Sequence, residues 1–198
     1  MKKDSINIAI FASGSGSNAV QIINHFLTEN SKAEFFVLSN KKEAPVLDKT
    51  ARLGANTLYF NKEDFYNSNK VVDYLIENNV QIIVLAGFLW LVPTNLLEAF
   101  PNRIINIHPA LLPKHGGKGM YGMHVHTAVV KAKETETGIT IHWIDEEYDQ
   151  GKIILQKTCT VDPSDTPEAV AKKVQQLEHK YFPIVVKELY SKISKEIS

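Results

Sequence analysis

Residues 6–18 read INIAIFASGSGSN, and this stretch indicates the fold. It begins with a short apolar run at 6–12 that ends in a glycine-rich turn at 13–16. Beyond the turn, Ser17 and Asn18 are residues that can cap a helix, and apolar residues then recur at helical spacing. A buried strand that leads through a glycine turn into a helix is typical of the first unit of a parallel α/β sheet.

Alternating strands and helices are predicted through the rest of the first half. Strands are expected at residues 34–38, 57–60, 81–86 and 104–107, and helices at 45–53 and 64–79, the latter with Val71, Leu75 and Ile76 facing inward. The run QIIVLA at 81–86 is too apolar to have a face in water. Since this alternation makes right-handed βαβ units, we expect an α/β fold with a Rossmann-like, mostly parallel sheet flanked by helices.

The second half of the chain has a different pattern. Residues 109–123 are rich in glycine and proline and predict a long loop, which a short helix at 126–132 follows. Strands are predicted at 138–144 and 152–161, as a C-terminal antiparallel extension of the sheet. Residues 166–197 are expected to be mostly helical, with an interruption near Pro183. No linker or repeat divides the sequence, so we expect one domain over residues 1–198.

The composition narrows the class of partner. Lysine and arginine together number 22, as do aspartate and glutamate, so the formal net charge is zero and no positive field favours a nucleic acid. The single cysteine, Cys159, cannot form an internal disulfide, which suits a reducing cytoplasm. No stretch approaches the roughly 18 apolar residues of a membrane span, and the apolar run after Met1-Lys2-Lys3 is too short for a secretory signal.

The glycine loop at residues 13–18 is a candidate phosphate site. Backbone N–H groups at a helix start point toward one spot, where the helix dipole favours an anion. Gly14, Gly16 and Ala19 loosely match the G-x-G-x-x-A spacing of dinucleotide sites. Such a site also needs an acidic residue after the second strand, where this chain has Ser39-Asn40-Lys41. The pattern therefore favours a single phosphate over NAD, with a tight turn that binds no ligand as the alternative.

Asn106 and His108 stand at the end of the strand predicted at 104–107. They are two positions apart, so both side chains point to one face, at the strand end where open α/β sheets bind ligands. An amide can stabilise a developing oxyanion, and an imidazole can move a proton near neutral pH. Asp149, in a turn-like setting before Gln150-Gly151, could bring a carboxylate against His108. A strand end with purely structural polar groups is the alternative.

Three further segments are ambiguous. The carboxylates at 145–147 are most simply a solvated face. The apolar stretch at 89–92 follows a buried strand and is either core or the wall of a slot for a flat ring. His124 and His126 form an H-x-H pair, but no third ligand stands at a recognisable spacing, so no metal is predicted.

Several segments together resemble the phosphoribosylglycinamide formyltransferases, a folate-dependent family of purine synthesis. They occur in the family's order and span nearly the whole chain. The INIHP-x-LLP run with a later D-x-G is specific for folate formyl-transfer domains as a group, whereas the glycine loop and the Q-x-x-EH helix indicate the ribonucleotide branch. The matching segments are SGSGSN at 13–18, LSNK at 38–41, VLAGFLWLVP at 84–93, INIHPALLP at 105–113, HWIDEEYDQGKIILQ at 142–156 and VQQLEHKYFP at 174–183.

The resemblance implies the reaction and the site. The chain would transfer a formyl group from 10-formyltetrahydrofolate to the glycinamide amine of 5'-phosphoribosylglycinamide, without a metal, as a cytoplasmic monomer or homodimer that acts on small molecules. The amine would attack directly, with Asp149 keeping His108 charged. By resemblance, the catalytic residues are Asn106, His108 and Asp149; those that meet the substrate's phosphoribose are Gly16, Ser17, Asn18, Gln175 and Glu178; and those that meet the folate are Leu89, Trp90, Leu91, Val92, Asn106, Asp145 and Asp149.

The sequence also departs from this family and leaves rival functions. The loop at 114–123 looks longer than in compact members, and the arginine that the family commonly has for the folate tail is absent around residues 62–64. Methionyl-tRNA formyltransferase and formyltetrahydrofolate deformylase resemble the same core but carry a further C-terminal or N-terminal domain. With the first predicted strand at residue 6 and the last residue at Ser198, we expect neither domain. A non-catalytic dinucleotide-binding module is disfavoured by the missing ribose-binding acid.

Overall fold

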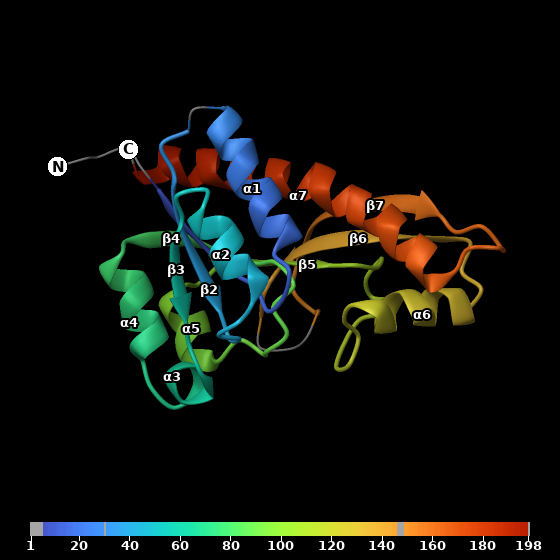
Figure 1. Ribbon diagram of the computed structural model, residues 1–198, viewed down its shortest axis with the longest axis horizontal. Helices are drawn as coiled ribbons and strands as arrows, with labels where there is room; N and C mark the ends of the chain where they lie inside the picture. Colours follow the sequence, from blue (N-terminus) through green and yellow to red (C-terminus); the bar gives the residue numbers. More distant parts are fainter. Residues whose placement is uncertain (1–5, 30, 146–148, 198) are drawn as a thin grey trace.

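The computed structural model of the chain describes residues 6–29, 31–145 and 149–197. Its strands are β1 (Asn7–Phe11), β2 (Glu34–Ser39), β3 (Asn56–Tyr59), β4 (Val80–Leu85), β5 (Ile104–His108), β6 (Glu136–Trp143) and β7 (Ile153–Thr160). They form one sheet in the order β3-β2-β1-β4-β5-β6-β7 (Figure 1). Pairing is parallel from β3 to β5 and antiparallel from β5 to β7. The mostly parallel sheet with an antiparallel C-terminal extension is therefore confirmed.

Helices cover both faces of this sheet. They are α1 (Ser17–Thr28), α2 (Pro45–Ala51), α3 (Lys62–Tyr66), α4 (Lys70–Glu77), α5 (Thr94–Ala99), α6 (Met123–Lys131) and α7 (Pro167–Ile197). One face carries α1, α2 and α7, and the other carries α3, α4 and α5 (Figure 1). α6 packs against α7 beside the antiparallel strands.

The apolar runs of the sequence become strands because both of their faces are buried. In β1, Ile8 and Ile10 belong to the core cluster under α1 and α7, whereas Ala9 and Phe11 belong to the cluster under α3, α4 and α5. A strand between two helical layers has no position that faces water, so every position favours an apolar residue. This is why the short run at 6–12 is a reliable sign of a central strand.

The region predicted as one helix at 64–79 is two helices. α3 starts with a capping box between Asn61 and Asp64, and α4 starts only at Lys70. The intervening asparagine and serine residues at 67–69 favour caps and turns because their side chains compete for backbone hydrogen bonds. Ile76 was expected to face inward but is 55% exposed, which is a wrong prediction, whereas Val71 and Leu75 are buried.

The predicted interruption near Pro183 is also wrong, because α7 continues through that residue. A proline in a helix interior removes one N–H bond and costs about 3 kcal/mol. Phe182, Val185 and Val186 next to it are buried, and burying such side chains stabilises the helix by about 1.5–3 kcal/mol each. Packing therefore outweighs the proline. Despite the length of α7, no helix in the described part of the chain is apolar enough to cross a bilayer.

The strand order determines where a ligand can bind. From β1 the chain crosses to β2 on one side, while β4 lies on the other side of β1. In open α/β sheets, ligands bind outside the carboxyl ends of the strands at such a reversal. The glycine loop follows β1 and residues 86–92 follow β4, so both segments stand at this edge.

Candidate active site

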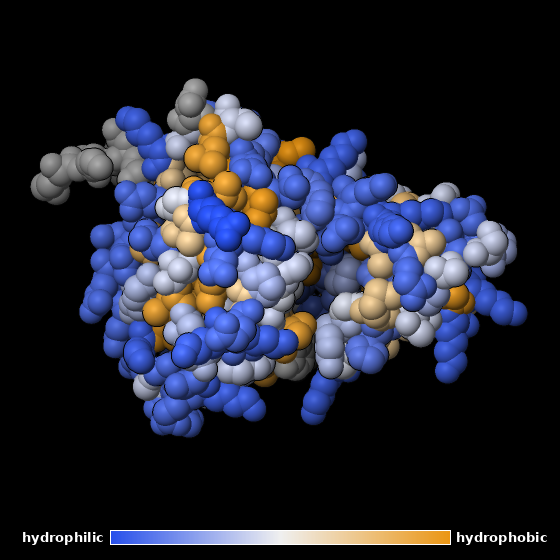
Figure 2. Space-filling view, in the orientation of Figure 1, coloured by the Kyte–Doolittle hydropathy of each residue, from blue (hydrophilic) through white to orange (hydrophobic). Residues whose placement is uncertain are grey.

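A cavity of about 650 Å³ opens at this edge of the sheet, a volume that suits a small-molecule site. Figure 2 shows the surface hollowed between the body of the sheet and the α6 end of the molecule. The structure brings together the residues that the sequence assigned to the site, although this placement does not test their roles. The assigned residues that line the cavity are Gly16, Ser17, Asn18, Leu89, Trp90, Leu91, Val92, Asn106, His108, Asp145, Asp149, Gln175 and Glu178.

The glycine loop presents the bare start of α1 to the cavity. Gly16 is the N-cap residue, with φ of 73°, and among the described residues no side-chain cap bond to the first N–H groups of the helix is present. Ser17 and Asn18, expected as caps, are instead the first helical residues. A side chain on Gly16 would collide with Val46 of α2. Glycine is therefore needed here both for its left-handed backbone and for its lack of a Cβ atom.

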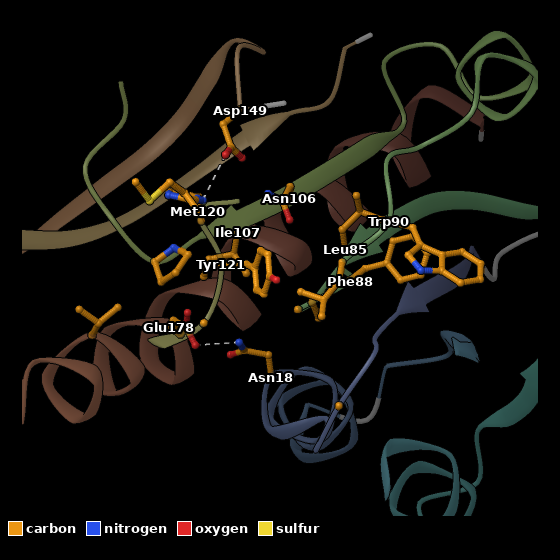
Figure 3. Close-up of a pocket in the computed structure, with 18 of the residues that line it drawn as sticks. Asn18, Leu85, Phe88, Trp90, Asn106, Ile107, Met120, Tyr121, Asp149 and Glu178 are labelled. Atoms are coloured by element: carbon orange, nitrogen blue, oxygen red, sulfur yellow. Dashed lines mark hydrogen bonds and ion pairs between the residues drawn. The ribbon is translucent and has the colours of Figure 1, made fainter. Parts of the chain in front are cut away.

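Asn18 and Glu178 close the same end of the cavity. The Asn18 Nδ2 donates to Glu178 Oε2 over 2.9 Å, and the Asn18 Oδ1 is buried without a hydrogen-bond partner among the described residues. Burial raises the pKa of Glu178, and the bond from Asn18 offsets only part of that rise. Gln175 lies one helical turn earlier and is exposed at the cavity wall. Figure 3 shows the Asn18–Glu178 pair across the cavity from Asn106 and Asp149.

His108 is held between two oxygen atoms. Its Nε2–H donates to the backbone carbonyl of His115 over 2.9 Å, and its Nδ1 lies 3.4 Å from Asp149 Oδ2. The His108 ring is almost fully buried, with 3% of the residue exposed. The bond to the carbonyl fixes the tautomer, so Nδ1 is the nitrogen that remains to exchange a proton beside the carboxylate.

The pKa values of this pair correct one expectation. Burial lowers the pKa of His108, and the Asp149 charge and the His115 carbonyl offset only part of the decrease. Burial also raises the pKa of Asp149, but its contacts, which include the hydrogen bond from the Gly117 N–H, lower it by more than that rise. At neutral pH the pair is thus a neutral imidazole beside a carboxylate. The direction of the His108 shift runs against the expectation that Asp149 keeps the ring charged, because desolvation outweighs the carboxylate.

His142 is a site residue whose role the sequence reasoning missed. It is fully buried and lies opposite Asn106 in the β5–β6 ladder. Its Nδ1–H donates to the Trp143 carbonyl over 2.9 Å, so Nε2 is free to accept from Asn106 Nδ2 at 3.2 Å. The same Nε2 lies 3.6 Å from Asp149 Oδ1. The alternation in strand 138–144 could have placed His142 on a single face with Thr140, but only the register brings it to Asn106.

Asp149 has a left-handed backbone conformation, with φ of 58°. Aspartate is one of the few residue types other than glycine that adopt it, because its short polar side chain can hydrogen-bond locally. The Gly117 N–H donates to its Oδ2 over 2.9 Å. Glu146 and Glu147, expected as part of a solvated face, lie outside the described residues.

An apolar wall lines part of the cavity. Figure 3 shows Leu85, Phe88 and Trp90 together on one side of the cavity. In the segment 89–92, Val92 is core at 6% exposure, whereas Leu89 and Leu91 are exposed at the cavity. Lys62 Nζ stands 6.0 Å from the Trp90 ring centroid, near the position of the arginine that the sequence lacks.

Metal ligands do not converge in the described part of the chain. No group of three or more histidine, cysteine, aspartate or glutamate side chains there could hold an ion. His126 of the H-x-H pair lines the cavity, and its Nδ1 is buried without a partner among the described residues. Cys159 is partly buried in β7.

Known proteins are similar to this chain in sequence and fold over nearly its full length. A profile of the formyl transferase family, "Formyl transferase", matches residues 6–186. The phosphoribosylglycinamide formyltransferase of Bacillus subtilis (strain 168) is 35% identical over 186 residues, which cover 91% of this chain and 93% of that protein. The chloroplastic phosphoribosylglycinamide formyltransferase of Arabidopsis thaliana is 40% identical over 185 residues, or 90% of this chain. This chain spans 63% of the length of the Arabidopsis protein.

A solved structure agrees with these sequence relatives. The crystal structure of phosphoribosylglycinamide formyltransferase from Bacillus halodurans superimposes with a TM-score of 0.84 at 34% identity. The superposition covers 94% of this chain and 96% of that chain. The antiparallel strands at the end of the sheet are therefore part of a fold that a solved relative shares.

Proposed function

Because the chain belongs to the formyl transferase family, among its phosphoribosylglycinamide formyltransferases, we propose that it transfers the formyl group of 10-formyltetrahydrofolate to the amine of 5'-phosphoribosylglycinamide in purine (IMP) biosynthesis. One observation carries this proposal: a bare helix start, an apolar wall and the Asn106–His108–Asp149 group open into one cavity. Residues 1–198 would act as one domain, as a monomer or homodimer in the cytoplasm.

The two ends of the cavity match the two substrates. The phosphate would lie against the N–H groups of Gly16, Ser17 and Asn18, where no side-chain cap competes for them. Glu178 and Gln175 would accept from the ribose hydroxyls, and the unpartnered Asn18 Oδ1 could accept another hydrogen. The flat pterin ring suits the apolar wall at 85–92. The substrates would therefore meet between the ends, beside Asn106 and His108.

The reaction needs one proton transfer and no oxidant or metal. The glycinamide amine attacks the formyl carbon, and the new C–N bond forms as the amine nitrogen loses a proton. His108 Nδ1 accepts this proton, because Nε2 keeps its own hydrogen on the His115 carbonyl. The bond from the formyl carbon to the folate nitrogen then breaks, and the proton passes from His108 to that nitrogen. The products are the formylated amide and tetrahydrofolate.

Two charges are stabilised during these reaction steps. Asp149, 3.4 Å from Nδ1, favours the imidazolium as it forms. Asn106 has one amide hydrogen on His142, which leaves its second hydrogen for the developing oxyanion. A well-placed donor of this kind contributes roughly 2.7–4 kcal/mol to the transition state. Holding both reactants in one cavity supplies further acceleration.

The test is a folate absorbance assay with and without 5'-phosphoribosylglycinamide. Release of the formyl group only with the acceptor present supports the transferase. Release at the same rate without the acceptor would identify a hydrolase, in which water replaces the amine. No release, together with binding of NAD, would identify a nucleotide-binding module and contradict the proposal.

A further inference from the structure

One short segment, the loop at residues 114–117, contacts both His108 and Asp149 through its backbone. The His115 carbonyl accepts from His108 Nε2, and the Gly117 N–H donates to Asp149 Oδ2, each over 2.9 Å. The first bond selects the tautomer of the imidazole and the second orients the carboxylate. The position of this loop therefore sets the geometry of the pair, although none of its side chains belongs to the pair.

Few contacts within the loop itself fix its position. It contains two consecutive glycines, Gly116 and Gly117, and His115 has a left-handed φ of 54°. Just before the loop, the Leu112 backbone is fixed to Thr140 over 3.0 Å and to Gln156 over 2.9 Å. Beyond Leu112 the Lys114 N–H donates to the Leu111 carbonyl over 3.1 Å, and any further anchor has to come from the side chains of the loop.

Glu134 supplies that anchor. It follows α6, and its own N–H donates to the Val129 carbonyl over 3.2 Å, so its backbone is tied to that helix. Its Oε1 lies 3.2 Å from His115 Nε2 and its Oε2 lies 2.9 Å from Lys114 Nζ. Hydrogen bonds from Lys114 and His115 lower the pKa of Glu134, so the carboxylate stays charged at neutral pH. Glu134 does not line the cavity.

We propose that Glu134 is a positioning residue for formyl transfer. It acts through loop 114–117 to hold the His108 ring and the Asp149 carboxylate in their position relative to each other. This inference rests on the proposed function of that pair. The contact with His115 matters more than the ion pair with Lys114. His115 and Glu134 side chains are only 15% and 21% exposed, whereas the Lys114 side chain is 68% exposed, and exposed ion pairs contribute little.

The first experiment measures kcat and KM. Glu134→Ala is expected to lower kcat about tenfold or more, because small misplacements of catalytic groups are costly, while both KM values and the melting temperature change little. His115→Asn tolerates the same left-handed backbone, but its shorter side chain loses the ring bond to Glu134, so it should show a similar loss. Glu134→Gln should restore part of kcat, since its amide oxygen can still accept from the His115 ring. Asp165→Ala removes another carboxylate that is paired with a lysine and does not line the cavity, and it should keep the wild-type kcat.

The second experiment does not depend on formyl transfer, because it measures the tautomer of His108 directly. Ring ¹⁵N chemical shifts should report a single Nε2–H tautomer for His108 in the wild type and a mixture in Glu134→Ala. An unchanged His108 signal together with a wild-type kcat in Glu134→Ala would overturn the inference. A loss of kcat that only follows a lower melting temperature would overturn it too, as a merely structural effect. Wild-type activity in His108→Ala would instead contradict the proposed function, and the tautomer measurement would still decide the role of Glu134.

Discussion

Asn18, in the first turn of α1, donates its side-chain N–H over 2.9 Å to Glu178 of α7, 160 positions later in the chain. The bond joins the glycine loop to the C-terminal helix at one end of the cavity. It also keeps a carboxyl group in a place where burial raises its pKa. The site therefore holds a group whose charged form destabilises the fold, which suggests that the carboxylate is kept for substrate binding.

Glu178→Gln is expected to stabilise the protein above the ordinary glutamate pKa of 4.5. The folded pKa is raised, so the stability that Glu178 contributes is fully present below its unfolded pKa and is lost as pH rises through the folded pKa. Glutamine keeps an acceptor for Asn18 without the charge. Thermal unfolding across pH should show equal melting temperatures near pH 4 and a higher value for the variant at neutral pH.

The same substitution should weaken ribonucleotide binding. A carboxylate accepts from hydroxyl groups more strongly than an amide, so the ribonucleotide KM should rise about tenfold while the folate KM stays near wild type. A variant that is no more stable than wild type at any pH would show that Glu178 is not a costly buried charge.

Gly16→Ala should reduce both stability and phosphate binding. The backbone φ of 73° costs an L-residue roughly 1–2 kcal/mol, and the new Cβ would collide with Val46. Chemical denaturation should show a loss of about 2 kcal/mol or more, and the ribonucleotide KM should rise far more than the folate KM. Adding Val46→Ala removes the contact with the Val46 Cγ2 atom, but it leaves the Cβ of residue 46 at 2.5 Å and the backbone strain, so it should recover only a small part of the stability.

Gly14→Ala is the matched control, because nothing lies within 4 Å of a Cβ built there. It should keep the wild-type free energy of unfolding. Equal rises of both KM values in Gly16→Ala would contradict the assignment of this loop to the phosphate.

Leu91→Asp should weaken folate binding. Leu91 is 36% exposed at the cavity, and a carboxylate there would lose about 2 kcal/mol of apolar contact with a flat ring, or about 30-fold in affinity. Calorimetry with a folate analogue measures this loss, and ribonucleotide binding should be unaffected. Ile76→Asp places the same charge at an exposed apolar position of α4 and should leave both affinities unchanged. An unchanged analogue affinity in Leu91→Asp would count decisively against the folate wall.

Much of the fold could be predicted because the central strands are buried on both faces. The runs at 6–12, 34–38 and 81–86 contain nearly nothing but apolar residues, and β1, β2 and β4 have almost the same bounds. The errors arise where tertiary packing overrides a local signal, as at Pro183, or where turn residues at 67–69 divide an apolar periodicity. α5 was not predicted from its sequence at all.

The sequence predicted those parts of the site that depend on the identity of side chains. Asn106, His108 and Asp149 do meet in one cavity, as their sequence context and family resemblance indicated. His115 contacts His108 through its backbone carbonyl, and because every residue has such a carbonyl, the residue type does not predict this contact. His142 reaches Asn106 through the register of β5 and β6, and a single sequence does not give that register. The neutral state of His108 depends on the depth of burial, which the sequence does not give either.

The pH dependence should show that His108 starts as a base. Burial lowers its pKa below 6.5, so the ring is neutral at neutral pH, and kcat/KM should rise with pH through that pKa and then level off. Asp149 raises the pKa of His108 by its charge, so Asp149→Asn should move the acid limb to lower pH. Rate profiles of both proteins measure this. A wild-type rate that instead falls as pH rises through the pKa of His108 would mean that the reaction starts from a charged ring.

The final prediction concerns His108 and Asp149 as one unit. Nδ1 and Oδ2 are 3.4 Å apart, and the proposed proton transfer needs the carboxylate only while the ring carries the proton. Groups that act together give losses that do not multiply. His108→Ala and Asp149→Asn should each lower kcat about 100-fold or more, and the double variant should be little worse than the more damaged single variant.

Stability has to be checked in this series, because His108 is buried, with 3% of the residue exposed, rather than outside the core as expected for a sheet edge. Circular dichroism and thermal unfolding of each variant show whether the fold survives, and His108→Gln fills more of the space if His108→Ala unfolds. If folded variants show losses that multiply in the double variant, the two residues act independently. A carboxylate that acts only through the imidazole has nothing to stabilise once the imidazole is gone. Losses that multiply would therefore contradict the proton transfer in which Asp149 acts through His108, even if both residues are essential.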